Sequence, residues 1–176
     1  MSEDAFRQDA FPRDAVDAIV DEWATQRPDL DTTAKQVTGR VIRLGALYQQ
    51  AFGESSRTVG IDNADFGILA ALRRAGVDNP LTPTELARRR MMTSGGMTAA
   101  LDRLERRGLV ARTANPADRR GSLVGLTDAG RDAIEQAVDL QAAVERRLVE
   151  ALSAEEVDQL VGLLRRLLLA VDPDSR

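Results

Sequence analysis

The sequence predicts a mostly α-helical fold that carries one small β-hairpin. Apolar residues recur at helical spacing along most of the chain, and aromatic residues make up only 3% of it. The core must therefore be built from Ala, Leu, Val and Ile, which suits helix packing better than a β-sandwich. Two short apolar runs, 109–113 and 123–126, flank a polar loop, as in a hairpin.

Amphipathic spacing predicts the order of the helices. They are expected over about 14–23, 33–52, 65–74, 83–90, 94–107, 128–152 and from 154 onward, with 53–56 as a loop. Thr82 can cap the fourth of these, Pro83 suits its first position, and Glu85 completes a capping box. Residues 153–156 form a second capping box, and Gly108 ends the helix before the hairpin. The 176 residues are enough for one medium domain or two interlocked lobes.

The composition excludes several kinds of site. The chain has neither Cys nor His, so a zinc finger, a thiol redox switch and an imidazole base are all excluded, and no metal or cofactor is expected. No apolar stretch approaches the roughly 20 residues that span a bilayer, and the acidic N-terminus has no signal-peptide pattern. We therefore expect a cytoplasmic protein without a membrane partner. The carboxylate pair Glu155-Glu156 is explained by helix capping, so we do not expect an enzyme.

The charge is unevenly distributed along the chain. Residues 81–121 hold nine Arg against four acidic residues, a net charge of +5, and this leaves −9 for the rest of a chain whose net charge is −4. A basic block in an acidic chain indicates a polyanion partner, although a solvated helical face is the simpler alternative.

The order helix, short turn, helix, Gly, hairpin is that of a winged helix-turn-helix. Such a domain places the N-terminal residues of its second helix in the major groove of duplex DNA and reaches the neighbouring minor groove with its hairpin. Asp118 at the hairpin tip would orient an arginine, and Arg103 would point outward to phosphate or base. The predicted DNA-binding residues are Thr82, Ser94, Gly95, Gly96, Met97, Thr98, Arg103, Asp118, Arg119 and Arg120.

Apolar stripes on the terminal helices predict a homodimer. Val16, Ile19, Val20 and Trp23 form one stripe, and a second runs from Val157 to Val171. Long helices that cannot bury such stripes within one small lobe bury them against a partner. The expected division is therefore 1–60 for dimerisation and a pocket wall, 61–127 for DNA binding, and 128–176 for further dimerisation.

The central third of the chain resembles the MarR family of ligand-responsive regulators. The residues that carry this resemblance are Leu81 to Ala87, Ser94, Gly95, Met97-Thr98, Leu101 to Glu105, Arg107 to Val110, Asp118 to Arg120, and Leu126 to Gly130. The resemblance implies a triangular winged-helix dimer that binds palindromic DNA and often represses transcription. It also implies a small effector, bound between the DNA-binding and dimerisation parts, that releases the DNA.

The N-terminal part resembles the branch of the family that includes urate-responsive and PecS-like regulators. Trp23, Arg27 to Asp31, Gly39-Arg40 and Arg43-Leu44 carry this resemblance. The branch's pocket uses a Trp, an Asp and two Arg; Trp23 and Arg112 match the first and the last, whereas Gly67 and Ala100 replace the charged pair. The implied ligand-binding residues are Trp23, Tyr48, Phe66, Gly67, Ala100 and Arg112, with an aromatic or phenolic ligand expected in place of urate. Trp23 could instead be an ordinary packing residue.

Together these patterns predict a sequence-specific regulator, a repressor released from its operator by a small ligand. The alternative is a winged-helix module that contacts only proteins and has no response to DNA or ligand.

Overall fold

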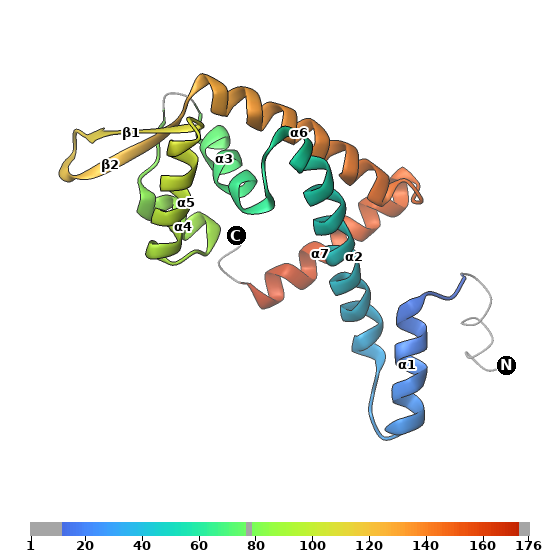
Figure 1. Ribbon diagram of the computed structural model, residues 1–176. Coiled ribbons are helices and arrows are strands. Elements are labelled where there is room, and N and C mark those ends of the chain that lie inside the picture. Colours follow the sequence, from blue (N-terminus) through green and yellow to red (C-terminus); the bar gives the residue numbers. More distant parts are fainter. Residues whose placement is uncertain (1–11, 77–78, 173–176) are drawn as a thin grey trace. The chain divides into compact units, whose positions relative to one another are not determined.

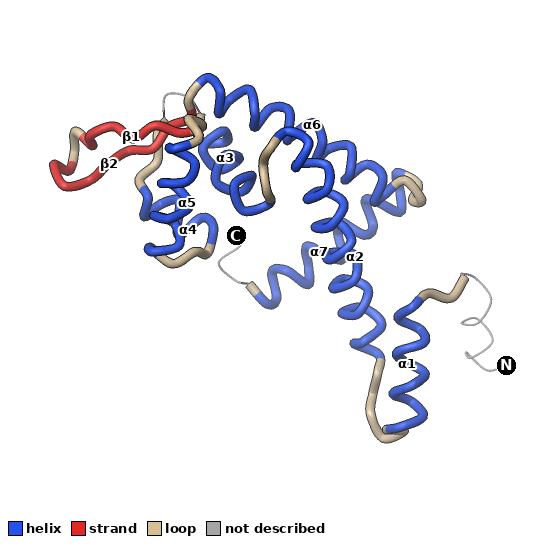
Figure 2. Tube along the Cα trace, viewed as in Figure 1, coloured by secondary structure: helices blue, strands red, loops and turns tan. Residues whose placement is uncertain are grey.

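The computed structural model describes residues 12–76 and 79–172 (Figure 1). The chain divides into two compact units, residues 1–47 and 48–176. The elements in chain order are α1 (Ala15–Gln26), α2 (Thr33–Ser56), the 3-10 turn η2 (Arg57–Val59), α3 (Asn63–Ala75), α4 (Pro83–Arg90), α5 (Ser94–Arg106), β1 (Val110–Asn115), β2 (Asp118–Leu126), α6 (Asp128–Val149) and α7 (Ala154–Val171). Figure 2 shows the single hairpin among the helices, so the predicted fold class is confirmed.

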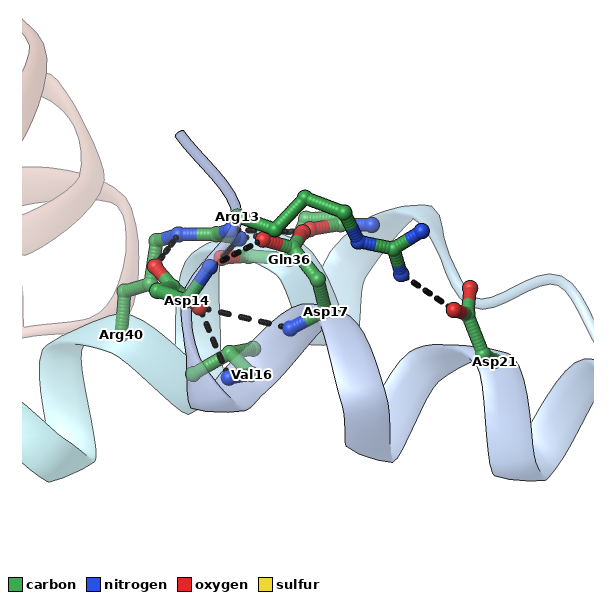
Figure 3. Close-up of polar contacts among 7 residues, drawn as sticks. All are labelled: Arg13, Asp14, Val16, Asp17, Asp21, Gln36 and Arg40. Atoms are coloured by element: carbon green, nitrogen blue, oxygen red, sulfur yellow. Dashed lines mark hydrogen bonds and ion pairs between the residues drawn. The ribbon is translucent and has the colours of Figure 1, made fainter. Parts of the chain in front are cut away.

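The first unit is a hairpin of α1 and the beginning of α2. The two helices approach closely at Gly39, where a Cβ atom would lie only 2.8 Å from Cγ1 of the buried Val16. Beside this contact, Arg40 binds the carboxylates of Asp14 and Asp17, each at 2.8 Å (Figure 3). The backbone N–H of Asp14 and the guanidinium of Arg40 together lower the pKa of Asp17 below its ordinary value. An apolar contact and an ion-pair cluster therefore hold α1 on α2.

Helix α2 continues through the residues where the sequence predicted a loop. Gly53 to Ser56 complete its last turn, and η2 follows directly. Phe52 and Ser56 are both buried, and the Ser56 hydroxyl donates to the carbonyl of Gly53. Tertiary burial of this turn outweighs the weak helix propensity of Gly and Ser, so the predicted loop was wrong.

The core of the second unit lies among α3, α4, α5 and the base of the hairpin. Its fully buried members include Ile68 and Leu69 of α3, Leu86 of α4, and Leu101 and Leu104 of α5. Leu81 adds a short third strand segment, because its backbone exchanges hydrogen bonds with that of Val124 in β2. This ties the start of the helix-turn-helix to the hairpin.

The hairpin turns earlier than the sequence predicted. Asn115 pairs with Asp118, and the Asn115 side chain accepts a hydrogen bond from the backbone N–H of Ala117 at 3.0 Å. Residues 118–121 therefore belong to β2, whereas the sequence placed them at the tip. The Asn115 side chain completes a turn of this kind locally, so strand pairing resumes at once.

Helix α6 begins against the backbone of Gly108 and Leu109, which connect α5 to β1. The Thr127 hydroxyl caps α6 at the N–H of Gly130 and also donates to the Gly108 carbonyl at 2.6 Å. A Cβ atom on Gly130 would lie 1.8 Å from the carbonyl oxygen of Leu109. Only glycine permits this approach, which joins α6 to the base of β1.

We expect Gly130→Ala to lower the free energy of unfolding by about 2 kcal/mol or more, because the added methyl group must displace backbone rather than a mobile side chain. Chemical denaturation of the purified protein measures this. Gly95→Ala is the matched control, since a Cβ atom there has no neighbour within 4 Å. Gly95→Ala should leave stability unchanged or slightly higher, and equal losses in the two variants would contradict the close approach.

Candidate nucleic-acid interface

Helix α4 has the predicted start. The Thr82 hydroxyl accepts from the N–H of Glu85, whose carboxylate accepts in turn from the N–H of Thr82, and Pro83 occupies the first turn. The hydrogen bonds from the Thr82 N–H and hydroxyl lower the pKa of Glu85 below its ordinary value. Three arginines, residues 88–90, fill the last turn, where the helix dipole favours positive charge.

The turn between α4 and α5 presents the N-terminus of α5 to solvent. Met91 adopts a left-handed conformation with φ 51° and is 92% exposed. Thr93 then caps α5 by accepting from the N–H of Gly96 at 3.2 Å. The next residues, Ser94, Gly95, Gly96 and Thr98, are all exposed. This small, neutral surface with unpaired helix N–H groups is suited to a close approach by nucleic acid.

Met97 does not belong to this surface. It is 1% exposed and packs in the core with Ala100, Leu101 and Leu104, one helical face of α5. Its predicted role in DNA binding was wrong, because the 3.6-residue period turns position 97 inward when 101 and 104 are inward.

Arg103 also differs from its prediction. Its guanidinium binds the carboxylate of Asp65 at 2.5 Å instead of extending outward, and this bond raises the pKa of Arg103. Arg107, which caps the C-terminal end of α5, binds the other oxygen of Asp65 at 2.6 Å. Sequence reasoning missed Asp65, because its two partners lie 38 and 42 residues away along the chain.

Arg112 on β1 is held by acidic residues of α5. Its Nη1 lies 2.7 Å from Asp102 Oδ1 and 3.2 Å from Glu105 Oε2, while its backbone N–H donates to the Glu105 carboxylate. These contacts attach the hairpin to the recognition helix. The sequence had predicted Arg112 in the ligand pocket. Arg112 does not line the cavity that is described below.

The hairpin brings Asp118 next to Gly121. A Cβ atom at Gly121 would lie 3.0 Å from Asp118 Oδ2, so glycine leaves room for the carboxylate. The backbones of Arg119 and Arg120 lie in β2, but their side chains, predicted to contact DNA, are outside the described part of the chain.

A cavity of about 250 Å³ lies within the second unit. Tyr48, Phe66 and Gly67, which the sequence assigned to a ligand pocket, line it together with Gln49, Phe52, Asn63, Ala70, Arg74, Arg90 and Gln141. The rings of Phe52 and Phe66 meet edge to face at 4.6 Å. The Tyr48 hydroxyl accepts from Gln141 at 2.7 Å, and burial raises the pKa of Tyr48.

The cavity has cations that the sequence did not identify. The guanidinium of Arg90 lies against Gly67, where a Cβ atom would come within 2.1 Å of it. Neither Arg90 nor Arg74 forms an ion pair within the described ranges, and none of the lining residues is acidic. Oδ1 of Asn63 is buried and receives no hydrogen bond from any residue in the described ranges. The site is therefore positively charged, aromatic on one side, and has an acceptor to satisfy.

Two further residues of the predicted pocket, Ala100 and Trp23, are not among the residues that line this cavity. Ala100 is a core residue, 4% exposed, so it forms no wall of this cavity. Trp23 belongs to the first unit, where it is 41% exposed and the Lys35 ammonium lies 5.1 Å from its ring centre.

In the part of the chain that the structure describes, no helix is long and apolar enough to cross a membrane.

A helix-turn-helix with an exposed recognition-helix N-terminus, followed by a two-stranded hairpin, defines the winged helix-turn-helix class of DNA-binding proteins. Residues 59–121 match the sequence model of the MarR family. The regulator PecS of Dickeya dadantii is 33% identical over 151 residues, which cover 86% of this chain and 91% of PecS. The chain belongs to the MarR family of transcriptional regulators.

Other relatives agree with this assignment. The multiple antibiotic resistance protein MarR of Escherichia coli is 38% identical over 136 residues, 73% of this chain and 92% of MarR. A crystal structure of a cysteine-to-serine mutant of that protein with operator DNA matches with a TM-score of 0.66 and 31% identity, covering 83% of this chain and 97% of the other. AbsC of Streptomyces coelicolor, at 22% identity and a TM-score of 0.70, shares the fold. These relatives are regulators rather than enzymes, as the sequence predicted.

Proposed function

We propose that the protein is a homodimeric repressor that binds a palindromic operator and leaves it when a small aromatic or phenolic ligand binds. The observation that carries the DNA-binding part is the start of α5, where Ser94, Gly95, Gly96 and Thr98 are exposed above a fully buried apolar face. A helix seated in this way offers its N-terminal N–H groups and small side chains to a major groove. The E. coli relative crystallised with operator DNA supports this choice of partner.

Charge supports the same assignment. Arg88 and Arg89, at the end of α4, are exposed and form no ion pair among the described residues. Cations beside a recognition helix supply the sequence-independent attraction to phosphate. We assign Thr82, at the start of α4, to a phosphate contact at that end of the helix.

Exposed apolar side chains support the dimer. On α7, Leu160, Leu164 and Leu168 are 39%, 43% and 53% exposed, and no residue of that helix is buried within the protomer. α1 and α2 carry a further exposed stripe that includes Ile19, Val41 and Leu44. Stripes of this size in one protomer are typical of a surface that a second copy covers. We assign residues 1–60 and 128–176 to dimerisation, residues 61–127 to DNA binding, and the protein to the cytoplasm.

The ligand class follows from the cavity lined by Tyr48, Phe66 and Gly67. About 250 Å³ accommodates a single-ring molecule, since an apolar cavity of about 150 Å³ is known to hold benzene. The guanidinium groups of Arg74 and Arg90 favour a carboxylate or phenolate on that ring, and Asn63 Oδ1 can accept from a hydroxyl group. Arg90 ends α4 immediately before the turn to α5, so pairing with a ligand would act on the helix-turn-helix itself.

A winged helix that contacts only proteins is the competing function. It would show no sequence preference when genomic fragments are offered in a gel shift at increasing salt.

We expect the native protein to be a dimer at micromolar concentration and to protect a palindromic footprint of about 20 bp, because two recognition helices related by a dyad enter major grooves about 10 bp apart. Leu164→Asp should bury a charge in the dimer interface and lower both dimerisation and operator affinity at least about tenfold. Gln159→Asp, exposed on the same helix but off its apolar stripe, is the control. A native monomer in light scattering, or a footprint without a dyad, would refute this assignment.

We expect Arg120 to contact DNA from the hairpin and Asp118 to hold it. Arg120→Ala should weaken operator binding and reduce the salt slope by about 1 per half-site. Asp118→Ala should also weaken binding, although simple electrostatics predicts a gain when a negative charge is removed. Arg147→Ala, about 28 Å along α6 from its start, controls for the loss of one positive charge. Tighter binding by Asp118→Ala would rule out the orienting role.

We expect aromatic acids and phenols to bind the protein and to release it from the operator, and urate to bind weakly or not at all. Arg90→Gln should reduce affinity for an aromatic carboxylate about tenfold or more, because it removes the cation that lies on Gly67. Calorimetry measures this directly.

Arg88→Gln is the matched control for the ligand experiment, because it removes one positive charge from the same helix without lining the cavity. Equal affinities of the two variants for the ligand would refute the assigned site. Tight urate binding with DNA release would refute the ligand class.

A further inference from the structure

We propose that Asp65 is a positioning residue that sets the sequence specificity of DNA binding by holding Arg103 and Arg107 of the recognition helix away from phosphate. This inference rests on the proposed DNA binding and concerns a group that touches neither the DNA-facing start of α5 nor the ligand cavity. We call the three side chains the Asp65 clamp.

The geometry of the clamp is that of a built ion pair. Asp65 is 1% exposed, at the first turn of α3, and each of its two carboxylate oxygens receives a different guanidinium. Arg107 also donates to the carbonyl of Gly60, the left-handed residue that precedes α3. One carboxylate thus joins α3, the chain before it, and two successive turns of α5.

Asp65 lies at a suitable place in α3 for a buried acidic residue. Asp62 caps the helix by accepting from the backbone N–H of Asp65 at 2.7 Å, so Asp65 lies in the first turn, where the helix dipole stabilises negative charge. Two guanidinium partners compensate the desolvation of the buried carboxylate. A buried charge with both oxygens engaged has one favourable arrangement, and it therefore fixes the register of α5 on α3.

The pairing with Asp65 leaves one donor of Arg103 unsatisfied within the described ranges. Nε of Arg103 is buried and has no hydrogen-bond partner among the residues that the structure describes. The carboxylate of Asp65 therefore orients the guanidinium of Arg103, even though this orientation leaves Nε without an acceptor in that part of the chain. Its orientation depends on Asp65, so removing the carboxylate should release it.

The consequence for DNA binding follows from the two kinds of contact that a regulator makes. Arginines that reach phosphate raise affinity for every sequence, whereas contacts at base edges discriminate between sequences. The DNA-facing residues Ser94 to Gly96 and Thr98 are small and neutral, so their discrimination depends on accurate placement of α5. By pairing two arginines with one buried carboxylate, the clamp limits non-specific binding and fixes the helix that reads the bases.

Asp65→Asn tests the clamp with the side-chain shape retained. We expect affinity for non-operator DNA to rise, the salt slope of binding to steepen by about 1 to 2 per protomer as the arginines reach phosphate, and the ratio of operator to non-operator affinity to fall at least about tenfold. Asp62→Asn is the matched control: it removes one carboxylate from the same turn and keeps a capping residue. Its specificity ratio should stay within about threefold of the wild-type value.

Arg103→Gln provides a second test that does not depend on the folding of Asp65→Asn, because Arg107 still pairs with the carboxylate. We expect an unchanged salt slope with a lower specificity ratio. A slope reduced by about 1 per half-site would show that Arg103 contacts phosphate and would overturn the proposal. So would an Asp65→Asn protein that matches Asp62→Asn, or that loses operator and non-operator binding equally. Absence of any sequence-specific binding by the wild-type protein would instead refute the proposed function.

Discussion

The burial of one face of α5 is the constraint on which the rest of the DNA-binding unit depends. Met97, Ala100, Leu101 and Leu104 lie in a core shared with α3, α4 and the hairpin base. Because successive residues of a helix point in different directions, burying that face leaves Ser94 to Gly96 and Thr98 exposed at its start. The surface that we assign to DNA is therefore a consequence of packing: small residues are exposed there because the large ones are needed inside.

Ion pairs then decide which cations of the basic block remain available. Arg103 and Arg107 are engaged by Asp65, and Arg112 by Asp102 and Glu105. These pairs brace α5 against α3 on one side and against β1 on the other. A block of net charge +5 is thus partly an internal scaffold, and its contribution to phosphate binding is smaller than its count of arginines suggests.

Glycines, which have no Cβ atom, allow the other close approaches between elements. At Gly130 the space is taken by the Leu109 carbonyl, which joins α6 to the hairpin, and at Gly39 by Val16, which joins α1 to α2. At Gly67 it is taken by the Arg90 guanidinium, which brings a positive charge into the cavity. The same chemical feature, the absence of a side chain, therefore supports packing at two positions and changes the charge of a candidate binding site at the third.

The sequence by itself determined the helices, the hairpin, the caps at Thr82 and Ser153, and the class of regulator, because these depend on periodicity and on side chains that act within a few residues. It was wrong about Met97, about the turn of the hairpin, and about the helical residues 53–56, where burial overrode local propensity. Only the tertiary structure decided that Asp65 would hold Arg103 and Arg107, 38 and 42 residues away, and that Arg90 would lie on Gly67. The physical reason is that a charged group pairs with a partner that the fold brings close to it. In the same way, the space beside a glycine is filled by a side chain that the fold brings there. Neither contact is encoded in the neighbouring sequence.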